Sequence, residues 1–490
     1  MTESQSKHDT TEIEWHHEPI VVGYAFGPKK MKSMGVVMAE ASRIPVIREE
    51  VEELDFTAIY RHEDACESLC EDEKPTGTLT RAALHDLESG MNTCTAHQSS
   101  TIFPLGNASD SDLKYIVRHF RSSCSSVAST SETTASTRTT TSSWNSYSSQ
   151  APSPVRISFV PLDPEIPLEE QHGGNFDMIL HKLTEDILTC SLSDQKDGAA
   201  VRRIQALKRY KETINPGCCL LDDPVNVETL MSRSAIAKVL QKYLRDVRST
   251  SGIPVRAPKC LVFESSVEQS HCQAKLLAKQ LRDLGFSTPL MIKPLVAAGT
   301  KESHFMTIIL KWSALSKLQP GSIIQEYINH NASLYKVYVL GKNVFVYERT
   351  SLPNLPPTDQ MDIAIDSLEF DSQRPYPRLN DFGISDDMSD LESAVGQDGQ
   401  SHHPCDATHV SVTVDEILPV VDTLRHAFGL ELFGFDILLS QDYKEFHVVD
   451  VNYFPSYKEV PNFPMLLAQY LTQRVLEQRR VRRLRISSKS

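Results

Sequence analysis

The sequence predicts an α/β protein built in three parts. Short apolar runs of strand length alternate with segments whose apolar residues recur at helical spacing. A long Ser/Thr-rich tract interrupts the first of these units, and two neighbouring apolar runs near the end have acidic residues embedded in them. We divide the chain into an N-terminal tail (1–18), an N-terminal domain (19–224) with a low-complexity insertion (44–154), central and C-terminal domains (225–475) with an acidic loop (384–406), and a basic tail (476–490).

Composition indicates a soluble protein that is large enough for several domains. The chain has 490 residues, of which 40% are hydrophobic. No apolar run approaches the ~20 residues that cross a bilayer, and the polar, acidic start does not resemble a signal peptide. The ten cysteines lack the spacing of a disulfide scaffold or of paired zinc half-sites, so we expect reduced thiols and a cytoplasmic protein. Cys218 and Cys219 are expected in a buried strand.

The formal net charge of -14 does not exclude a polyanionic ligand, because the negative charge is concentrated. Acidic residues outnumber basic ones in the insertion (44–154), and residues 384–406 contain six acids and no Lys or Arg. If both segments are surface insertions, the folded body is close to neutral. It can then carry a local basic pocket.

The N-terminal domain is expected to open with a buried parallel strand, PIVVGYAF, followed by a helix, MKSMGVVMAEAS. The insertion then ends in a Ser/Thr tract that has too few apolar residues to offset the entropy of ordering. We expect 44–154 to be mostly disordered, with a short helix near 111–121. Strand patterns resume at RISFVPL and FDMILHKL, and a helix is expected over AAVRRIQALKRYKETI.

The second half is expected to begin with two helices and then to continue as a run of strands. The helices are TLMSRSAIAKVLQKYL and VEQSHCQAKLLAKQLRDLGF, with a strand near KCLVF between them. The strands are PLMIKPLV, HFMTIIL, GSIIQEYI, LYKVYVLG and NVFVYERTS, the last two joined by a tight turn at 341–343. After the acidic loop come a helix (VDEILPVVDTLRHAFG), two strands (LFGFDILLS and EFHVVDVNYF) and a final helix.

The last two strands predict a site for a hard divalent cation. Asp436 lies on the first strand, and Asp450 and Asn452 share one face of the second because strand side chains alternate. Two carboxylates and an amide oxygen suit Mg²⁺, which also holds substrate phosphates. An isolated pair of this kind is more often a strand-end turn or cap, but these acids lie inside apolar strands, where a carboxylate without a cation is costly.

Two further stretches contain candidates for nucleotide binding. Lys293 projects from an apolar strand before a loop with Gly299, Thr300, Ser303 and His304, and such a lysine can hold phosphates. A surface lysine beside a generic hairpin explains that segment equally well. In the next stretch an apolar strand runs into the polar Gln325–Glu326 step, as at a linker that offers backbone groups to adenine, and Lys336 follows on the next strand.

Together these stretches resemble the inositol 1,3,4-trisphosphate 5/6-kinase family, also called inositol-tetrakisphosphate 1-kinases, which have an ATP-grasp fold. The resemblance covers roughly 19–43 and 155–475. It rests on eight motifs in the family's order: VGYAFGPKKMK, HKLTEDIL, SRSAIAKVL, KPLVAAGTKESH, QEYINHNASLYKVYVLG, ERTSLPN, LFGFDILL and DVNYFPSYKEV.

The resemblance implies an ATP-dependent, Mg²⁺-dependent kinase that phosphorylates a soluble inositol polyphosphate. It implies Mg²⁺ ligands at Asp436, Asp450 and Asn452, with Lys293 and Asp450 as the catalytic residues. It implies ATP contacts from Arg233, Lys293, Gln325, Glu326, Ile328, Lys336, Ser351 and Ser372. It implies substrate contacts from Lys30, Lys182, His304, Lys336, Asn452 and Ser456. Two of these assignments depart from the family pattern, because the family often has Gly in place of Ser456 and because the alignment around Ser372 crosses variable loops.

Two alternatives stay open at this stage. An ATP-grasp ligase that couples an acylphosphate to an amine would use the same nucleotide and metal chemistry, but it gives no reason for Lys30 and Lys182. A non-catalytic phosphate-binding scaffold would not need Lys293 and the acids. We expect a monomer without a membrane span or a nucleic-acid partner, with an insertion open to protein partners. The RRVRRLR tail is expected to be a solvated helix end, although it also fits binding to nucleic acid, binding to an anionic membrane, or nuclear import.

Overall fold

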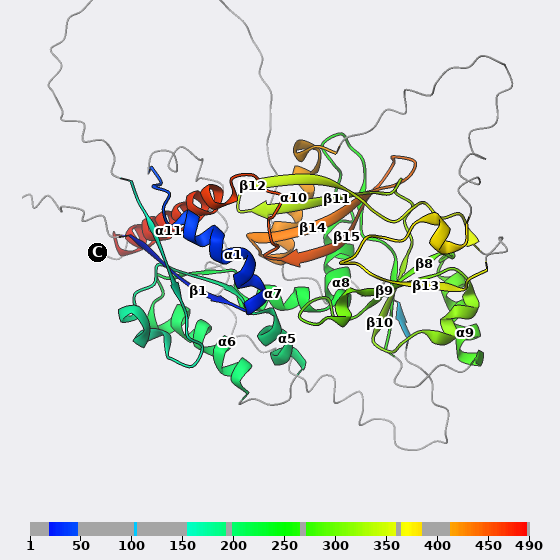
Figure 1. Cartoon of the computed structure of the whole chain (residues 1–490), viewed down its shortest axis with the longest axis horizontal. Coiled ribbons are helices and arrows are strands. Elements are labelled where there is room, and N and C mark those ends of the chain that lie inside the picture. Colours follow the sequence, from blue (N-terminus) through cyan, green and yellow to red (C-terminus); the bar gives the residue numbers. More distant parts are fainter. Residues whose placement is uncertain are drawn as a thin grey trace, which may run out of the picture.

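The computed structural model describes residues 19–47, 102–104, 154–192, 198–264, 271–358, 364–384 and 412–487. These residues form three β-sheets with helices packed around them (Figure 1). The N-terminal sheet has the strand order β3-β1-β4-β5, the central sheet β13-β9-β8-β10-β7-β2, and the C-terminal sheet β12-β11-β14-β15-β6. Most of the expected Ser/Thr tract, the helix expected near 111–121 and most of the acidic loop lie outside the described residues.

The N-terminal part is a parallel sheet, as the apolar opening strand predicted. Its strands are β1 (Ile20–Phe26), β3 (Ile157–Pro161), β4 (Met178–Lys182) and β5 (Cys219–Leu221). Its helices are α1 (Pro28–Ala41), η1 (Leu168–Gly174), α5 (Thr184–Leu192), α6 (Ala199–Arg209), η2 (Tyr210–Ile214), α7 (Pro224–Glu228) and η3 (Thr229–Met231). Cys218 and Cys219 are both buried, as expected.

The central part is an antiparallel sheet covered on both faces. Its strands are β2 (Ile102–Pro104), β7 (Cys260–Phe263), β8 (Leu290–Pro294), β9 (Phe305–Ile309), β10 (Ser322–Glu326) and β13 (Ser367–Asp371). Its helices are α9 (His271–Asp283), η4 (Glu302–His304), η5 (Trp312–Lys317) and η7 (Leu379–Phe382). The apolar run of β8 is explained by two separate cores, since Leu290 and Ile292 pack into one of them and Met291 into the other.

The C-terminal part contains the longest strands of the described chain. Its elements are α8 (Arg233–Tyr243), β6 (Val255–Arg256), β11 (Ser333–Leu340), β12 (Asn343–Thr350), α10 (Val414–Phe428), β14 (Leu432–Leu439), β15 (Phe446–Tyr453) and α11 (Phe463–Ser487). The expected tight turn joins β11 to β12, and Gly341 adopts a φ of 55° there, which favours glycine. The helix expected from residue 229 is split, because Ser232 is extended and ends η3 before α8 begins.

The last helix ties the end of the chain to its first strand. In Figure 1, α11 lies beside α1. Its buried Leu467 and Leu471 belong to the same hydrophobic core as β1 and β14. Farther along, Arg479 donates to Asp177 Oδ1 at 2.6 Å, while Asp177 Oδ2 accepts from the backbone of Val21 at 2.9 Å. The boundary expected at 476 therefore falls inside a helix that packs on the N-terminal part.

The two ends of the long insertion lie next to each other. Val46 and Val155 form an antiparallel bridge in which each backbone N–H donates to the other's carbonyl at 2.9 Å. The chain therefore leaves the N-terminal sheet and returns to it at one point. Within the insertion, the described strand β2 pairs with β7 at the edge of the central sheet.

Removing residues 62–150 should leave the fold and the site intact. The bridge between Val46 and Val155 closes the sheet without them, and the remaining linker easily spans the paired ends. We expect the melting temperature to change by only a few degrees and turnover to stay within about twofold, measured by calorimetry and by product formation from the soluble protein. Loss of soluble protein would show that the insertion, with β2, is needed for folding.

Candidate functional site

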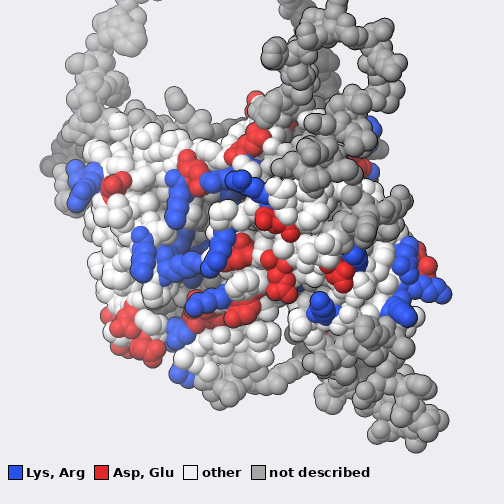
Figure 2. All heavy atoms as spheres, turned by 45° about the vertical axis from the view of Figure 1, so that its right-hand side comes forward, with Lys and Arg blue, Asp and Glu red and all other residues white. Residues whose placement is uncertain are grey.

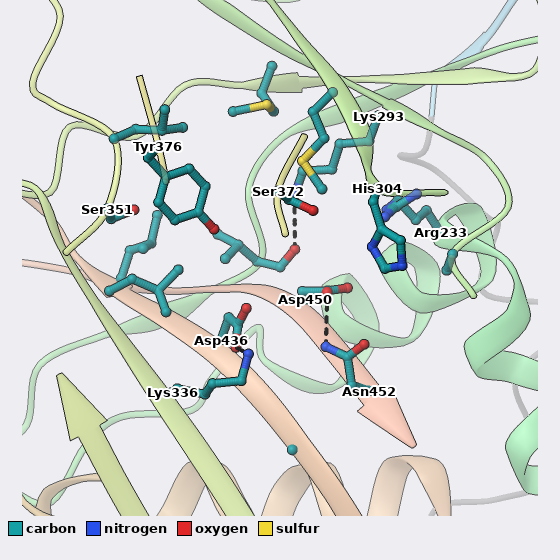
Figure 3. A pocket seen from close by; sticks show the side chains of 18 of the residues that line it. Arg233, Lys293, His304, Lys336, Ser351, Ser372, Tyr376, Asp436, Asp450 and Asn452 are labelled. Atoms are coloured by element: carbon teal, nitrogen blue, oxygen red, sulfur yellow. Dashed lines mark hydrogen bonds and ion pairs between the residues drawn. The ribbon is translucent and has the colours of Figure 1, made fainter. Parts of the chain in front are cut away.

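A cavity of about 370 Å³ lies between the central and C-terminal sheets, and the N-terminal part contributes to its wall. Figure 3 shows charged side chains converging on its middle, with Ser351 at one end and Arg233 at the other. All but one of the site residues predicted from the sequence line it. They are Lys182, Arg233, Lys293, His304, Gln325, Glu326, Ile328, Lys336, Ser351, Ser372, Asp436, Asp450, Asn452 and Ser456.

The two acidic residues face each other across neighbouring strands. Asp436 of β14 is paired directly with Asp450 of β15, and the register shifts immediately afterwards so that Ile437 pairs with Val448. Val449 is thus the extra residue of a β-bulge, which turns two consecutive side chains to one side. Val449 and Asp450 accordingly both line the cavity. Asn452 shares the face of Asp450, as alternation predicted, and its Nδ2 donates to Asp450 Oδ2 at 3.0 Å.

Asp436 is partly buried, and its buried Oδ1 has no hydrogen bond among the described residues. Burial raises its pKa, and the nearby Asp450 raises it further, while Lys336 lowers it. Lys336 Nζ lies 3.5 Å from Oδ1, which is an ion-pair distance but long for a hydrogen bond. A divalent cation would satisfy this oxygen and neutralise the facing carboxylates. The residues therefore fit Mg²⁺, which is commonly held by one or two carboxylates together with substrate phosphates.

Two buried cations, Lys293 and Arg233, lie near Asp450. Lys293 of β8 donates from Nζ to the carbonyl of the bulge residue Val449 at 3.2 Å. Burial lowers the pKa of Lys293 to about 8, against the opposing effect of Asp450. Arg233, the first residue of α8, donates to the carbonyls of Pro294, Val296 and Ser303 at 2.7–2.9 Å. Arg233 thus holds the loop that follows β8, and this loop leads to His304.

His304 and its neighbours form the rim beside Arg233. Gln373 Nε2 lies 2.9 Å from His304 Nε2, and the backbone N–H of Ser372 donates to the carbonyl of His304 at 2.9 Å. Burial lowers the pKa of His304, with a smaller contribution from Lys29. The backbone hydrogen bond joins η4 to the end of β13. It holds His304, predicted to contact the substrate, next to Ser372, predicted to contact ATP.

Lys182 and Lys30 reach the site from the N-terminal part. Lys182 Nζ donates to the carbonyls of Tyr453 and Phe454 at 2.9 Å each. Lys30 Nζ donates to Phe454 at 3.0 Å and to Pro455 at 2.7 Å, and it lies 3.6 Å from the centre of the Phe454 ring. Lys182 lines the cavity, whereas Lys30 is buried behind the segment that follows β15. The pKa of Lys182 is lowered to about 8 by burial and by Lys29, and the pKa of Lys30 is lowered well below its usual value by burial and by Lys182.

The end of the cavity near Ser351 is mostly apolar. Its walls include Met291, Met306, Leu334, Leu352, Phe370 and Leu438. The side chain of Glu326 is turned towards Lys259, whose backbone N–H donates to Oε1 at 2.6 Å. The Gln325–Glu326 step therefore presents its backbone beside the cavity while the acid is held elsewhere. An apolar slot with a few polar groups is the usual form of a nucleotide or cofactor site.

Sequence reasoning missed several residues that line the cavity. Gln373 contacts His304, Tyr376 projects over the cavity near Asp436 (Figure 3), and His330 lies behind Ser351. Burial, with Asp436 and Asp450, raises the pKa of Tyr376 to about 12. Tyr376 and Gln373 follow a strand, β13, for which no pattern had been identified. His330 lies in the INHN stretch (328–331), but the sequence alone does not predict its contact with Ser351, which is 21 residues further along the chain.

The negative net charge of the chain is not spread evenly over the folded part. Figure 2 shows one face on which Lys and Arg side chains gather beside Asp and Glu side chains near the middle. A local group of cations can attract a polyanion despite the net charge of -14. None of the helices in the described ranges combines the length and the apolarity that a membrane crossing requires.

Comparison with known proteins identifies the family. Its ATP-grasp domain, described as the inositol 1,3,4-trisphosphate 5/6-kinase ATP-grasp domain, matches residues 257–473, and its pre-ATP-grasp domain matches residues 146–226. A Xenopus laevis protein named inositol-tetrakisphosphate 1-kinase is 32% identical over 321 residues, which are 64% of this chain and 71% of that protein. The chain belongs to the inositol 1,3,4-trisphosphate 5/6-kinase family. Membership confirms the predicted ATP-grasp fold class and the resemblance from which it was drawn.

Other members of the family are similarly related to this chain. The inositol-tetrakisphosphate 1-kinase of Danio rerio is 31% identical, over 63% of this chain and 69% of that protein. Inositol-tetrakisphosphate 1-kinase 4 of Glycine max is 30% identical, over 64% of this chain and 79% of that protein. Among solved structures, the D-alanine–D-alanine ligase of Bacillus anthracis covers 68% of this chain and 89% of its own, at 12% identity and a TM-score of 0.34. That distant likeness carries no argument about function.

A buried polar network connects the family's pre-ATP-grasp part to the end of β15. His181 Nε2 donates to the carbonyl of Asp222 at 2.6 Å. Tyr453 OH donates to the carbonyl of His181 at 2.8 Å and accepts from the N–H of Asp222 at 3.1 Å. The Asp222 side chain accepts from the backbone N–H groups of Glu431 and Leu432 at 3.0 Å each. This network fixes β4, and hence Lys182, against the end of β15.

His181 should make the protein labile to acid. Burial lowers its pKa from 6.5 to about 4, so the unfolded chain takes up a proton at this histidine before the folded protein does. The folded state is therefore not penalised above pH 6.5, and its stability falls as the pH falls from 6.5 towards 4. We expect the free energy of unfolding of the wild type to fall by roughly 2 kcal/mol from this group by pH 5. His181→Gln, which keeps a donor but does not titrate, should lose less stability between pH 7 and pH 5 in urea titrations. An equal loss in both proteins would contradict this assignment.

Proposed function

We propose that this protein transfers the γ-phosphate of ATP to a hydroxyl of a soluble inositol polyphosphate. The observation that carries the proposal is the convergence of opposed carboxylates, Asp436 and Asp450, with Lys293 in one cavity that Lys182 of the N-terminal part also lines. The relatives are named inositol-tetrakisphosphate 1-kinases, which supports this substrate class. A ligase would give no reason for Lys182 in this cavity, and a phosphate-binding scaffold would give no reason for Lys293 and the opposed carboxylates.

The nucleotide is assigned to the slot between the central and C-terminal sheets. Its adenosine half would occupy the apolar end, beside Gln325, Glu326, Ile328 and Ser351, where the linker backbone can pair with the base. The triphosphate would then extend towards Lys293. Arg233 would act by holding the loop after β8, because three of its five donors already bind protein carbonyls.

Mg²⁺ would be held by Asp436, Asp450 and the amide oxygen of Asn452, and it would neutralise charge on the transferred phosphoryl group. Lys293 supports the same phosphates from the opposite wall. Lys336, which pairs with Asp436, lines the same cavity and would contact either substrate. These groups act by positioning and by charge stabilisation, so the reaction requires no covalent intermediate on the protein.

The inositol phosphate is assigned to the side of the cavity that faces the N-terminal part. Lys182, His304, Lys336, Asn452 and Ser456 all line the cavity, and three of them are potential cations. A ring with several phosphates requires charges that arrive from different directions, and these residues come from all three parts of the fold. Lys30 would contribute by holding the Phe454–Pro455 segment beside Ser456, in addition to its charge.

Asp450→Asn should abolish phosphoryl transfer while the protein remains folded. The substitution preserves shape and the contact with Asn452 but removes one carboxylate charge from the proposed metal site. We expect turnover to fall by at least about a hundredfold, with an unchanged circular dichroism spectrum, in assays of product formation from Mg-ATP and a panel of inositol phosphates. Asp442→Asn, at an exposed turn before the same strand, is the matched control and should be fully active. Activity of Asp450→Asn within threefold of the wild type would remove Asp450 from catalysis.

Lys182 should control affinity for the inositol phosphate in a manner that depends on pH. Its pKa of about 8 means that the free protein loses this positive charge as the pH rises above 8, whereas phosphate favours the charged form. Lys182→Ala should raise the KM for the inositol phosphate about tenfold or more, with much less change for ATP.

The matched variant is Lys182→Arg, which stays charged throughout this range. In the wild type, the KM for the inositol phosphate should rise between pH 7.5 and pH 9, and the rise should be smaller in Lys182→Arg. The measurement is steady-state kinetics with each substrate varied in turn. Identical pH profiles in the two proteins, or equal effects of Lys182→Ala on both substrates, would exclude this role.

A further inference from the structure

His330 is a buried histidine at the apolar end of the cavity, and both of its ring nitrogens have partners. Nδ1 lies 2.6 Å from the carbonyl oxygen of Ile328, and Nε2 lies 2.8 Å from Oγ of Ser351. His330 and Ser351 are 4% and 7% exposed, so solvent does not compete for these contacts. Both residues line the cavity. The proposed kinase chemistry at the other end of the cavity does not use His330.

The identity of these partners determines which ring nitrogen carries the proton. The carbonyl of Ile328 can only accept, so Nδ1 must be the N–H of the ring. Burial lowers the pKa of His330, which favours the neutral ring with a single N–H. Nε2 is then a bare acceptor, and the Ser351 hydroxyl must donate its only proton to it. The Ser351 oxygen therefore keeps two lone pairs and has no proton left to offer.

The backbone around this pair is fixed by reciprocal hydrogen bonds. Asn354 Oδ1 accepts from the N–H groups of His330 and Asn331 at 2.9 and 2.8 Å. The N–H of Ser351 donates to the carbonyl of Ala332 at 2.7 Å. The linker between β10 and β11 is thus joined to the residues that follow β12, so the backbone of His330 and of Ser351 is held in place. The hydroxyl orientation is a built-in property of this end of the cavity.

We propose that His330 is a positioning residue that makes Ser351 an obligate hydrogen-bond acceptor for the nucleoside half of the nucleotide, and so helps to select ATP. This inference rests on the proposed function. The recognised chemistry is an N–H or O–H donor, which ATP offers as the amino group of its base and as the hydroxyls of its ribose. A nucleotide with a carbonyl in place of that amino group, or without that hydroxyl, would leave the buried Ser351 oxygen unpaired.

Two variants of His330 separate the two contacts of the ring. His330→Asn places an amide near Nδ1, so it can keep the bond to the Ile328 carbonyl but loses the acceptor for Ser351. His330→Gln places its amide oxygen near Nε2, so it can keep that acceptor. Ser351→Ala removes the hydroxyl itself. The control is Ser322→Ala, a buried serine of β10 that bonds to the carbonyl of Gln319 and does not line the cavity.

The experiment compares kcat/KM for ATP, ITP, 2′-deoxy-ATP and 3′-deoxy-ATP at saturating inositol phosphate. In the wild type, at least one analogue should be used about tenfold or more less well than ATP, and ITP distinguishes the base from the two hydroxyls. Ser351→Ala and His330→Asn should each reduce that preference to within about threefold, through a change in KM more than in kcat. The double variant should be no less selective than either single one. His330→Gln and Ser322→Ala should retain the wild-type preference.

The proposal is overturned if no analogue is discriminated, if Ser351→Ala keeps the wild-type preference, or if His330→Gln loses it as fully as His330→Asn. Only variants that melt within a few degrees of the wild type are compared, and if His330→Asn fails to fold, Ser351→Ala and His330→Gln decide the question. The outcome is separable from the proposed function. A protein inactive with every nucleotide would refute the kinase assignment, whereas an active kinase with unchanged preferences would refute only the role of His330.

Discussion

The site depends on holding two partly buried carboxylates opposite each other. Asp436 and Asp450 are paired directly across β14 and β15, and two negative charges on directly opposed strand residues repel each other. The surrounding cations offset this repulsion in the free protein. Lys336 reaches Asp436 from the next strand, and Lys293 approaches from the central sheet with its own pKa lowered by burial. In the proposed function, a bound cation would neutralise the negative charge that these lysines leave uncompensated.

Hydrogen bonds from lysines to backbone carbonyls join the three separate sheets into one site. The bulge at Val449 turns a backbone carbonyl to Lys293, and the carbonyls after β15 receive Lys182 and Lys30. Backbone carbonyls of β15 and of the residues that follow it thus accept hydrogen bonds from lysines of both other parts of the fold. A shift of β15 would therefore disturb its hydrogen bonds to the central sheet and to the N-terminal sheet together. Substrate phosphates that draw on these lysines would compete with the carbonyls for the same donors.

Local patterns in the sequence predicted the features that are local in origin. Alternation along β15 was sufficient to place Asp450 and Asn452 on one face, and the apolar runs located most strands of the three sheets. The bulge at Val449 was not predictable, since it depends on register against β14 and not on residue type. The burial of Lys30 behind Phe454 and the bond between His330 and Ser351 likewise depend on residues distant in the sequence, where periodicity contains no information.

The link between Arg479 and Asp177 has a consequence for the order in which the protein can assemble. Asp177 and Val21 are synthesised long before Arg479, whose guanidinium completes their contact from α11. The early sheet is also covered by α11, which contains the final described residues. The part that supplies Lys30 and Lys182 therefore cannot reach its final packing until α11 has been synthesised and has emerged from the ribosome.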